Sequence, residues 1–428
     1  MTAVGDLVPL MIEKVVHGGR GMGRWDGAPV FVAGALNGEH IAARVTAVRK
    51  GYADAALEQV VTSSAQRVEA PCPSFPACGG CQLQHAAYDA QLALKRDIVR
   101  ETLQRLGGLD IDVPPVVPSP EPFGYRLRAQ LKIARSGRPP AIGYFAARSH
   151  DVVSAPTCLV LHPRLQAALT VLRELVAGSD VRLANVREVE LQTTSASDEC
   201  VIVLHLDSLQ IGTLPALART LRAQIRLRGL VAYTPRGRRI DGGDWLEERI
   251  SGLVCRVSDR TFLQVNAGAN ASLVGTVVAW AALQGGGRVV DLYAGFGNIS
   301  LPLAATSRVT AVESSPTAAD DARWNARATG RRVRVVGRRV EAWTPTADDL
   351  RPEVAVLDPP RAGLSRRALA RVLALDAPRL LYVSCEPATL ARDARRLADA
   401  GYRVTRLQSF DFFPQTAHVE TLLELSRR

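Results

Sequence analysis

The sequence predicts an α/β protein whose C-terminal part is a parallel, doubly wound sheet. From about residue 256, short apolar runs such as VAVLDPP and LLYVSC alternate with helical stretches such as AADDARWNARATG. Near-continuous apolar strands joined by helical crossovers are typical of parallel sheets that carry helices on both faces. Ligands bind such Rossmann-like sheets at the carboxyl ends of the strands, so we expect functional residues there.

The N-terminal residues 7–60 predict a small antiparallel β-barrel. Runs with alternating apolar residues, such as HIAARVTAVRK, are separated by glycine turns, such as HGGRGMGRWDG. This pattern is typical of small barrels that resemble the oligonucleotide-binding (OB) type. Many such barrels bind RNA, but a barrel alone does not identify an RNA-binding protein.

The middle of the chain predicts a mixed α/β domain. Residues 71–84 read as a loop rich in cysteine, glycine and proline, and residues 86–106 read as a helix. The proline-rich residues 111–122 predict a linker, and strand-like runs alternate with helix-like runs over residues 125–255. We expect three domains: the barrel (1–65), the cysteine loop with the mixed α/β domain (66–255), and the doubly wound sheet (256–428), on which the helix at 86–106 packs.

Charge and cysteine count narrow the class of protein. The formal charge is +11, and only four of the 53 basic residues are lysine. A basic excess fits a polyanionic partner such as RNA, whereas an arginine bias also arises from a GC-rich genome. Seven cysteines, in a chain where we expect no signal peptide, argue against a disulfide framework and favour metal binding or catalysis. No long apolar stretch predicts a membrane span, and we expect a cytoplasmic monomer without a membrane partner.

A strand that runs into a glycine turn, DLYAGFGNIS, predicts a cofactor site. Gly295 in this turn allows the backbone to approach a ligand closely, and Glu313, at the end of the next strand, can accept hydrogen bonds from ribose hydroxyls. The turn reads GxGxxS instead of the dinucleotide pattern GxGxxG, and Asp291 would repel a pyrophosphate. The cationic S-adenosylmethionine therefore fits better, and we expect Asp291, Gly295 and Asn298 to contact it.

Two further strand ends carry reactive side chains. Asp358 begins DPPR, and methyltransferases that act on amino groups often carry an aromatic residue where Arg361 stands, which argues against an amine substrate. Viewed alone, this motif also fits a proline-rich strand exit. Cys385 follows the next strand, before a helix start whose dipole favours a thiolate. We therefore expect a thiol with a depressed pKa, although a lone cysteine is more often an inert buried side chain.

A thiolate at this place predicts a particular reaction. Uracil carbon 5 is too weak a nucleophile to take a methyl group unaided, but a thiolate that adds to carbon 6 raises the electron density on carbon 5. A base must then remove the carbon-5 proton before the thiol is eliminated. Glu420, in FPQTAHVETLLEL, is our candidate base. His418 is its rival, because both lie on one face of an extended segment.

Four of these motifs, taken in order, resemble the RNA uracil-5-methyltransferase family of ribosomal and transfer RNA enzymes. They are DLYAGFGNISLPLA, LDPPRAG, YVSCEPATLARD and FPQTAHVETLLEL, and FLQVNAGAN resembles a fifth motif of the family. The barrel resembles the TRAM domain of the ribosomal RNA branch. The similarity spans nearly the whole chain and implies a class I methyltransferase fold, S-adenosylmethionine as cofactor and RNA as substrate.

The resemblance also implies roles for residues at matching positions. Cys385 would be the nucleophile and Glu420 the base. The cofactor would be contacted by Gln264, Tyr293, Glu313 and Asp358. RNA and its flipped base would be contacted by Arg126, Arg128 and Asp358, with Gln264 as a further uracil contact. The chain departs from the family at Arg339, where relatives often carry an asparagine near the adenine, and at Ala417, where the family usually has glycine.

Three cysteines within ten residues, Cys72, Cys78 and Cys81, predict a metal or cluster site. Zinc and an iron–sulfur cluster both fit three thiolates and one further ligand. Cys158 is our choice for the fourth ligand, and His85 or His162 would suit zinc instead. The resemblance implies a [4Fe–4S] cluster held by Cys158, as in the ribosomal RNA branch, and so favours 23S rRNA as substrate, with tRNA as the alternative.

Three other functions compete with this interpretation. A cytosine-5 methyltransferase would use the same thiolate chemistry, but those enzymes usually carry Pro-Cys where this chain has Asp358-Pro359-Pro360. A non-catalytic RNA-binding protein on a decayed methyltransferase fold would not be expected to keep Cys385, Glu420 and the glycine turn. A radical methylase would carry CxxxCxxC, which the spacing of the three clustered cysteines does not match.

Overall fold

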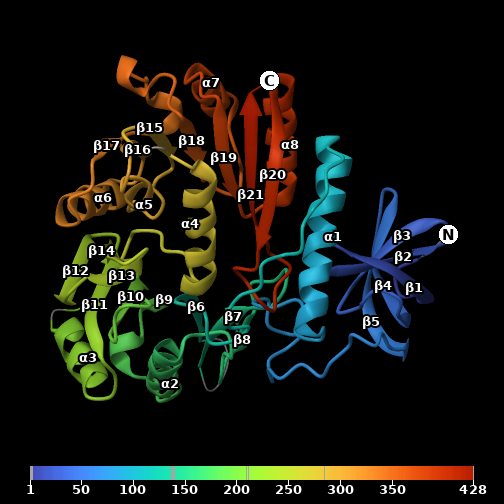
Figure 1. The fold of residues 1–428 in the computed structure, drawn as a ribbon. Helices are drawn as coiled ribbons and strands as arrows, with labels where there is room; N and C mark the ends of the chain where they lie inside the picture. The colour runs from blue at the N-terminus through green and yellow to red at the C-terminus, as the bar shows by residue number, and fades with distance from the viewer. Residues whose placement is uncertain (1–2, 136–139, 209, 211, 284, 428) are drawn as a thin grey trace.

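The barrel, one long helix and two large sheets follow one another along the chain in the computed structural model, which describes residues 3–135, 140–208, 210, 212–283 and 285–427 (Figure 1). The long helix α1 (Tyr88–Gly107) lies between the barrel and the C-terminal sheet. Leu103 in α1 is fully buried in the core of that sheet, and the helix ends where Gly108 adopts a left-handed backbone conformation. None of the described helices is long and apolar enough to cross a membrane.

Five strands form a closed barrel in the order β1-β2-β3-β5-β4. Val8, Leu10 and Ile12 alternate with exposed residues along the first strand and fill the interior, as the period of two predicts. The sequence predicted an antiparallel barrel, and this is wrong for one pair of strands, because β3 and β5 pair in parallel. An odd number of strands cannot close a ring with antiparallel pairs alone. The strands are β1 (Leu7–Val16), β2 (Arg20–Trp25), β3 (Ala28–Ala33), β4 (His40–Arg49) and β5 (Tyr52–Thr62).

The central region is a mixed seven-stranded sheet in the order β12-β11-β10-β9-β6-β7-β8. Helices α2 and α3 pack on one face, and Leu246 of the β13–β14 hairpin packs on the other. Its elements are β6 (Arg128–Ala134), β7 (Ala141–Phe145), β8 (Val152–Ser154), α2 (Pro163–Ala177), η1 (Val181–Leu183), β9 (Val186–Gln192), β10 (Cys200–Leu206), α3 (Thr213–Arg222), β11 (Leu227–Thr234), β12 (Gly237–Gly242), β13 (Trp245–Ile250) and β14 (Leu253–Ser258).

The C-terminal region is a second seven-stranded sheet in the order β17-β16-β15-β18-β19-β21-β20. Its elements are α4 (Ala267–Ala281), β15 (Arg288–Leu292), α5 (Ser300–Leu303), β16 (Arg308–Glu313), α6 (Pro316–Ala328), β17 (Val333–Gly337), η2 (Val340–Ala342), η3 (Ala347–Asp349), β18 (Val354–Leu357), α7 (Arg366–Ala374), β19 (Arg379–Ser384), α8 (Pro387–Asp399), β20 (Tyr402–Phe410) and β21 (Glu420–Arg427).

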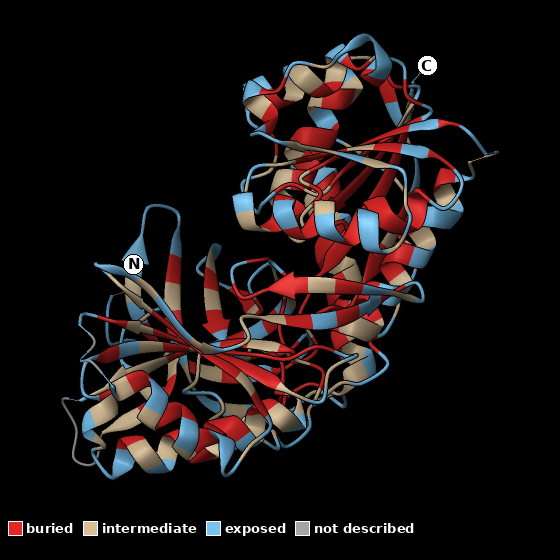
Figure 2. Ribbon diagram, turned by 90° about the vertical axis from the view of Figure 1, so that its left-hand side faces the viewer, coloured by how far each residue is buried: buried red, intermediate tan, exposed pale blue. Residues whose placement is uncertain are grey.

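Alternate residues of these strands enter two different cores. Leu380 and Tyr382 of β19 pack with α1, α7 and α8, whereas Leu381 and Val383 pack with α4, α5 and α6. Figure 2 shows the buried strands between helices whose outer faces are exposed. The predicted doubly wound sheet is thus confirmed, with one exception. β21 pairs antiparallel with both β19 and β20, so its first residue lies at the edge where β19 ends.

Candidate active site

The glycine turn after β15 is tied to the end of β16. Glu313 accepts a hydrogen bond from the Gly295 amide at 2.9 Å, and the Tyr293 amide donates to Val312 at 2.9 Å. Tyr293 has φ +67°, a left-handed conformation that an aromatic side chain rarely adopts. Such strained residues cluster at functional sites. Gly297 follows at φ +101°, where any side chain would be strained.

Asp291, the last-but-one residue of β15, has one buried carboxyl oxygen without a hydrogen-bond partner among the described residues. The Ser300 hydroxyl donates to the other carboxyl oxygen. Burial raises the pKa of Asp291 to about 7, the Ser300 hydrogen bond opposes the shift, and the charge of Glu313 adds to it. A buried carboxyl oxygen without a partner is costly, so the site fits a ligand that brings a donor or a positive charge.

Helix α4 is joined to the turn by side-chain hydrogen bonds. Asn270 of α4 and Asn298 of the turn exchange two side-chain hydrogen bonds, at 2.8 and 2.9 Å. Gln264 is buried and lines a small cavity with Asn270. Arg339, the departure from the family pattern, is exposed, and its charge opposes a rise in the Tyr293 pKa that burial causes. The side-chain amides of Asn270 and Asn298 thus join the turn to α4, and Arg339 lies near Tyr293.

Cys385 and Glu420 meet at the edge of the sheet. The last pair of the β19–β21 ladder is Ser384 with Thr421, and Cys385 and Glu420 are the next residue on each side. Glu420 is 3% exposed, whereas Cys385 is partly buried. Asp358 follows the neighbouring strand β18, and its charge influences both side chains. A thiol and two carboxyl groups are thus close enough at this edge for their charges to interact.

The expected depressed pKa of the Cys385 thiol is wrong for the free protein. Burial raises the pKa of Cys385 to about 11, and the carboxyl groups of Glu420 and Asp358 add to the rise. Arg361 is the opposing group, since its charge lowers this pKa. Burial and the charge of Asp358 likewise hold the pKa of Glu420 well above its usual range. The dipole of the following helix favours the thiolate, but burial beside two acids outweighs it.

His418, the rival base, is uncharged at neutral pH. Burial, and then the charge of Arg361, lower the pKa of its imidazole to about 4. His418 lies two residues before Glu420, the first residue of β21. The charges of Arg361 and of Glu386, the residue after Cys385, act on His418, whereas the charge of Glu420 acts on the Cys385 thiol itself. Glu420 is the stronger proton acceptor of the two, because its pKa is raised and that of His418 is lowered.

The loop before β21 is fixed by residues that sequence reasoning missed. Lys95 of α1 donates to Asp411 at 2.5 Å and to the Phe413 carbonyl at 3.0 Å. Gln91 and Gln415 exchange hydrogen bonds at 2.9 and 3.0 Å. The sequence offered one signal for these contacts: Lys95 occupies an apolar position of α1, and lysine is rare in this arginine-rich chain. These contacts set the position of the segment that leads to Glu420.

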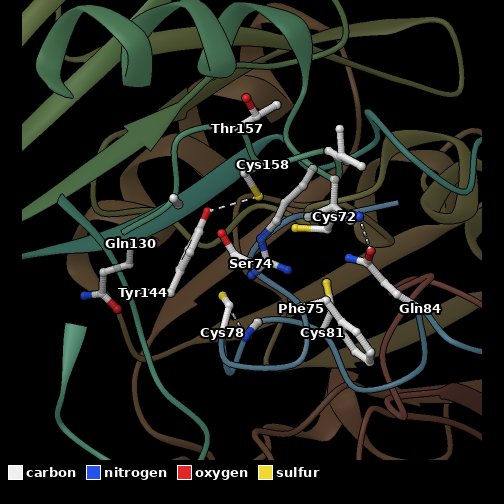
Figure 3. A pocket seen from close by; sticks show the side chains of 15 residues that line it. Cys72, Ser74, Phe75, Cys78, Cys81, Gln84, Gln130, Tyr144, Thr157 and Cys158 are labelled. Carbon is white, nitrogen blue, oxygen red and sulfur yellow. Dashed lines mark hydrogen bonds between the residues drawn. The ribbon is translucent and has the colours of Figure 1, made fainter. Parts of the chain in front are cut away.

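The four predicted cluster ligands surround one cavity of about 250 Å³. Figure 3 shows Cys72, Cys78, Cys81 and Cys158 with their sulfur atoms around the same space, although Cys158 lies far along the chain. All four thiols are free, and burial raises the pKa of Cys81 to about 12. The Tyr144 hydroxyl donates to the Cys158 sulfur at 3.8 Å.

The two histidines considered for zinc are placed differently. His162 caps α2 by accepting from the Arg164 amide. His85 is buried and stacks on Phe75 with ring centroids 5.5 Å apart. Neither histidine is among the described residues that line the cysteine cavity.

The arginines proposed to reach RNA lie beside these sites. Arg126 lines the cysteine cavity. Arg128 is engaged, because it donates to Glu190 at 2.7 Å and to the Thr261 carbonyl at 3.2 Å. The segment that carries both joins the Gln264 segment, since the Leu127 amide donates to Val265 at 2.8 Å. The structure thus links these arginines to the Gln264 segment and leaves neither as a freely exposed cation.

Comparison with known proteins decides the family. The model of the tRNA (uracil-5-)-methyltransferase family matches residues 87–428, and the model of the TRAM domain matches residues 2–57. The chain belongs to the tRNA (uracil-5-)-methyltransferase family. It is therefore an enzyme, as the sequence predicted, and its N-terminal barrel is a TRAM domain.

Relatives of the family cover this chain along almost its full length. An uncharacterized RNA methyltransferase of Thermosynechococcus vestitus is 36% identical and aligns over 99% of this chain and 98% of its own. A second, of Listeria innocua, is 33% identical over 98% and 97%. The crystal structure of Pyrococcus abyssi tRNA (uracil-54, C5)-methyltransferase with S-adenosyl-L-homocysteine matches with a TM-score of 0.76 at 24% identity, covering 98% of this chain and 100% of that one. The last likeness confirms the fold.

Proposed function

We propose that this enzyme transfers a methyl group from S-adenosylmethionine to carbon 5 of a uridine in RNA through a covalent bond between Cys385 and the uracil. The observation that carries the proposal is the pairing of Ser384 with Thr421, which sets Cys385 beside Glu420 at the edge that also holds the glycine turn. A nucleophile, a base and a cofactor turn are what methylation at a pyrimidine carbon requires.

The reaction assigns one task to each side chain. Cys385 gives its proton to solvent water, and the thiolate adds to carbon 6 of uracil, which makes carbon 5 nucleophilic. The bound cofactor supplies the methyl group on a positively charged sulfur. Glu420 then accepts the carbon-5 proton, and departure of the Cys385 sulfur restores the double bond between carbons 5 and 6. Arg361 favours both anions, because its charge lowers the pKa of Cys385 and of Glu420.

The residues at the glycine turn fit the proposed cofactor. Asp291 offers a buried carboxyl oxygen without a partner among the described residues, which suits a cationic ligand. The carboxylate of Glu313 is held by the Gly295 amide at 2.9 Å, beside the place where a ribose would lie. The other residues proposed to contact the cofactor are Gln264, Tyr293, Asn298 and Asp358. Asp358 is also proposed to contact the uracil.

The four cysteines fit an iron–sulfur cluster better than zinc. Zinc binds thiolates at about 2.3 Å, which sets neighbouring sulfur atoms about 3.8 Å apart. In the described chain no three of these sulfurs lie within 4.8 Å of one another. A wider group such as [4Fe–4S] suits that separation. We propose that Cys72, Cys78, Cys81 and Cys158 hold it, and that it serves structure or RNA contact, because methyl transfer moves no electron.

Metal analysis of anaerobically purified protein tests this cluster. Wild-type protein should be brown and contain iron, and Cys158→Ser should lose both properties. Cys200→Ser is the matched control, because Cys200 lies in the apolar core of the central sheet. Colourless wild-type protein that carries zinc would contradict the cluster.

The RNA substrate is proposed in two forms. A TRAM barrel together with a cysteine cluster favours 23S rRNA in the cytoplasm, with Arg126 and Arg128 beside the flipped base. The tRNA alternative is favoured by the fold match with an archaeal enzyme that acts on tRNA uracil-54. Mass-spectrometric mapping of both RNA classes from a deletion strain decides between them by the methyl group that is missing.

A tritium-release assay tests the reaction itself. RNA labelled with tritium at uridine carbon 5 loses tritium to water when the carbon-5 hydrogen is removed after methyl transfer. Wild-type protein should release tritium in the presence of S-adenosylmethionine, and Cys385→Ala should release none while still binding the cofactor. Release by Cys385→Ala at the wild-type rate would defeat the covalent mechanism.

A further inference from the structure

The turn between β1 and β2 of the barrel meets the catalytic edge of the C-terminal sheet. His17, in this turn, has its Nε2 atom 3.1 Å from Oε1 of Glu386. A hydrogen bond between these side chains raises the pKa of His17. Glu386 is the residue that directly follows the proposed nucleophile Cys385. A side chain of the barrel therefore contacts the immediate neighbour of the reacting sulfur.

The barrel is held closely in this position. Gly19, two residues after His17, has φ +77°, and a Cβ atom built on it would lie 3.0 Å from Cβ of Gln82 and 3.1 Å from Cβ of Ala417. A larger residue at Gly19 would push this turn away from both segments. An apolar cluster secures the same junction, and it consists of Val15, Leu36, Leu83, Ala86, Leu94 and Ala417. Figure 1 shows the barrel packed beside α1.

Glu386 links this contact to the backbone of Cys385. Its carboxylate accepts from the Ala388 amide at 3.3 Å and so caps the first turn of α8. Its own amide donates to the Ser384 hydroxyl at 3.2 Å. Cys385 lies between two residues that are fixed in this way, and its sulfur is half-buried in the wall of the site. The Glu386 carboxylate would keep its hydrogen bond from the Ala388 amide but would lose its contact with His17.

We propose that His17 is a positioning residue for Cys385, acting through Glu386, so that the TRAM barrel completes the active site in addition to any contact with RNA. The proposal rests on the proposed function of Cys385 as nucleophile. A positioning role predicts an effect on turnover, because small displacements of a reacting group reduce rates strongly. A role in RNA binding alone predicts an effect on RNA affinity.

Four variants separate these roles. His17→Ala removes the contact, and His17→Gln keeps a side-chain N–H that can donate to Glu386. Glu386→Ala removes the same contact from the other side. His40→Ala is the matched control, because His40 is an exposed histidine elsewhere on the barrel. Each variant is measured for kcat, for KM towards RNA, and for melting temperature as a check of folding.

We expect His17→Ala to lower kcat roughly 3- to 10-fold, the range for losing a partly exposed hydrogen bond to a charged group. KM for RNA should stay at the wild-type value, and His17→Gln should restore most of kcat. Combining His17→Ala with Glu386→Ala should cost no more than Glu386→Ala alone, because both remove one interaction. A raised KM with unchanged kcat in His17→Ala would overturn the proposal.

Alkylation of Cys385 by iodoacetamide, followed at its peptide by mass spectrometry, tests the same claim without RNA or cofactor. A loosened loop should expose the half-buried thiol, so His17→Ala should be alkylated several-fold faster than wild type, His17→Gln or His40→Ala. Equal rates in all four proteins would overturn the inference while leaving the proposed reaction intact. If wild-type protein proves unable to methylate RNA, the alkylation rates still decide whether His17 positions Cys385.

Discussion

Lys95 of α1 and Asp411 of the loop before β21 form an ion pair of 2.5 Å in which neither side chain is exposed. Lys95 also donates to the Phe413 carbonyl at 3.0 Å. The pair joins the helix that precedes the central sheet to the segment that leads to Glu420. The base proposed here is thus positioned by a residue more than 300 positions earlier in the chain.

Lys95→Met should destabilise the protein by roughly 3–5 kcal/mol, because it leaves the Asp411 carboxylate buried without its partner. Urea unfolding measures this free energy. Lys132→Met is the matched control, since Lys132 pairs with Glu188 in a partly exposed setting and should cost at most about 1 kcal/mol. Equal losses in the two variants would show that Lys95 is not a buried anchor.

Cofactor affinity should rise with pH. Burial raises the pKa of Asp291 to about 7, and burial together with the charge of Asp291 raises the pKa of Asp358. Both carboxyl groups are neutral when protonated and attract a cationic ligand only when ionised. We therefore expect calorimetry to show tighter binding of S-adenosylmethionine at about pH 8 than at about pH 6. Asp291→Asn should bind more weakly and with less dependence on pH, and a flat wild-type profile would argue against this role.

Arg361 should control the ionisation of Cys385. The pKa of the thiol is raised to about 11 by burial, with Arg361 as the opposing charge. Removing that charge should raise the pKa further and lower the thiolate fraction at any given pH. Arg361→Gln should therefore slow alkylation of Cys385 several-fold, whereas Arg367→Gln, a change at an exposed arginine of α7, should not. Equal alkylation rates in wild type and Arg361→Gln would show that Arg361 does not control the ionisation of Cys385.

Glu420→Gln should trap the reaction after methyl transfer. The amide cannot accept the carbon-5 proton, so the bond between Cys385 and carbon 6 cannot be eliminated. Denaturing electrophoresis should show a complex of protein and RNA that forms only with S-adenosylmethionine. Normal turnover by Glu420→Gln would assign the base to another group, with His418→Ala as the next variant to measure.

Local patterns were sufficient to predict the strand ends of the C-terminal sheet. Glu313, Asp358 and Cys385 each end or follow an apolar run, Asp291 lies one residue before the end of another, and in a parallel sheet such ends share one edge. The direction of β21 was not predictable in this way, because alternation of apolar residues is the same for either strand direction. Only the antiparallel pairing of β21 with β19 reveals that β21 begins, with Glu420, at that edge.

Long-range contacts account for the other differences. The pKa of Cys385 depends on burial and on acids that follow or begin other strands, and the local sequence around Cys385 reveals only the adjacent helix start. The contact of His17 with Glu386 joins residues 369 positions apart and leaves no local pattern. Spacing groups Cys72, Cys78 and Cys81, but no local pattern joins the predicted fourth ligand Cys158 to them, and the fold places all four around one cavity.

The central claim is most directly measured with RNA that carries 5-fluorouridine. Fluorine at carbon 5 cannot be removed as a cation, so a covalent intermediate accumulates after methyl transfer. Digestion and mass spectrometry should find the methylated nucleotide on the peptide that contains Cys385, and Cys385→Ser should give none. A nucleotide attached to any other residue, or turnover of uridine RNA without an adduct on fluorinated RNA, would contradict the account.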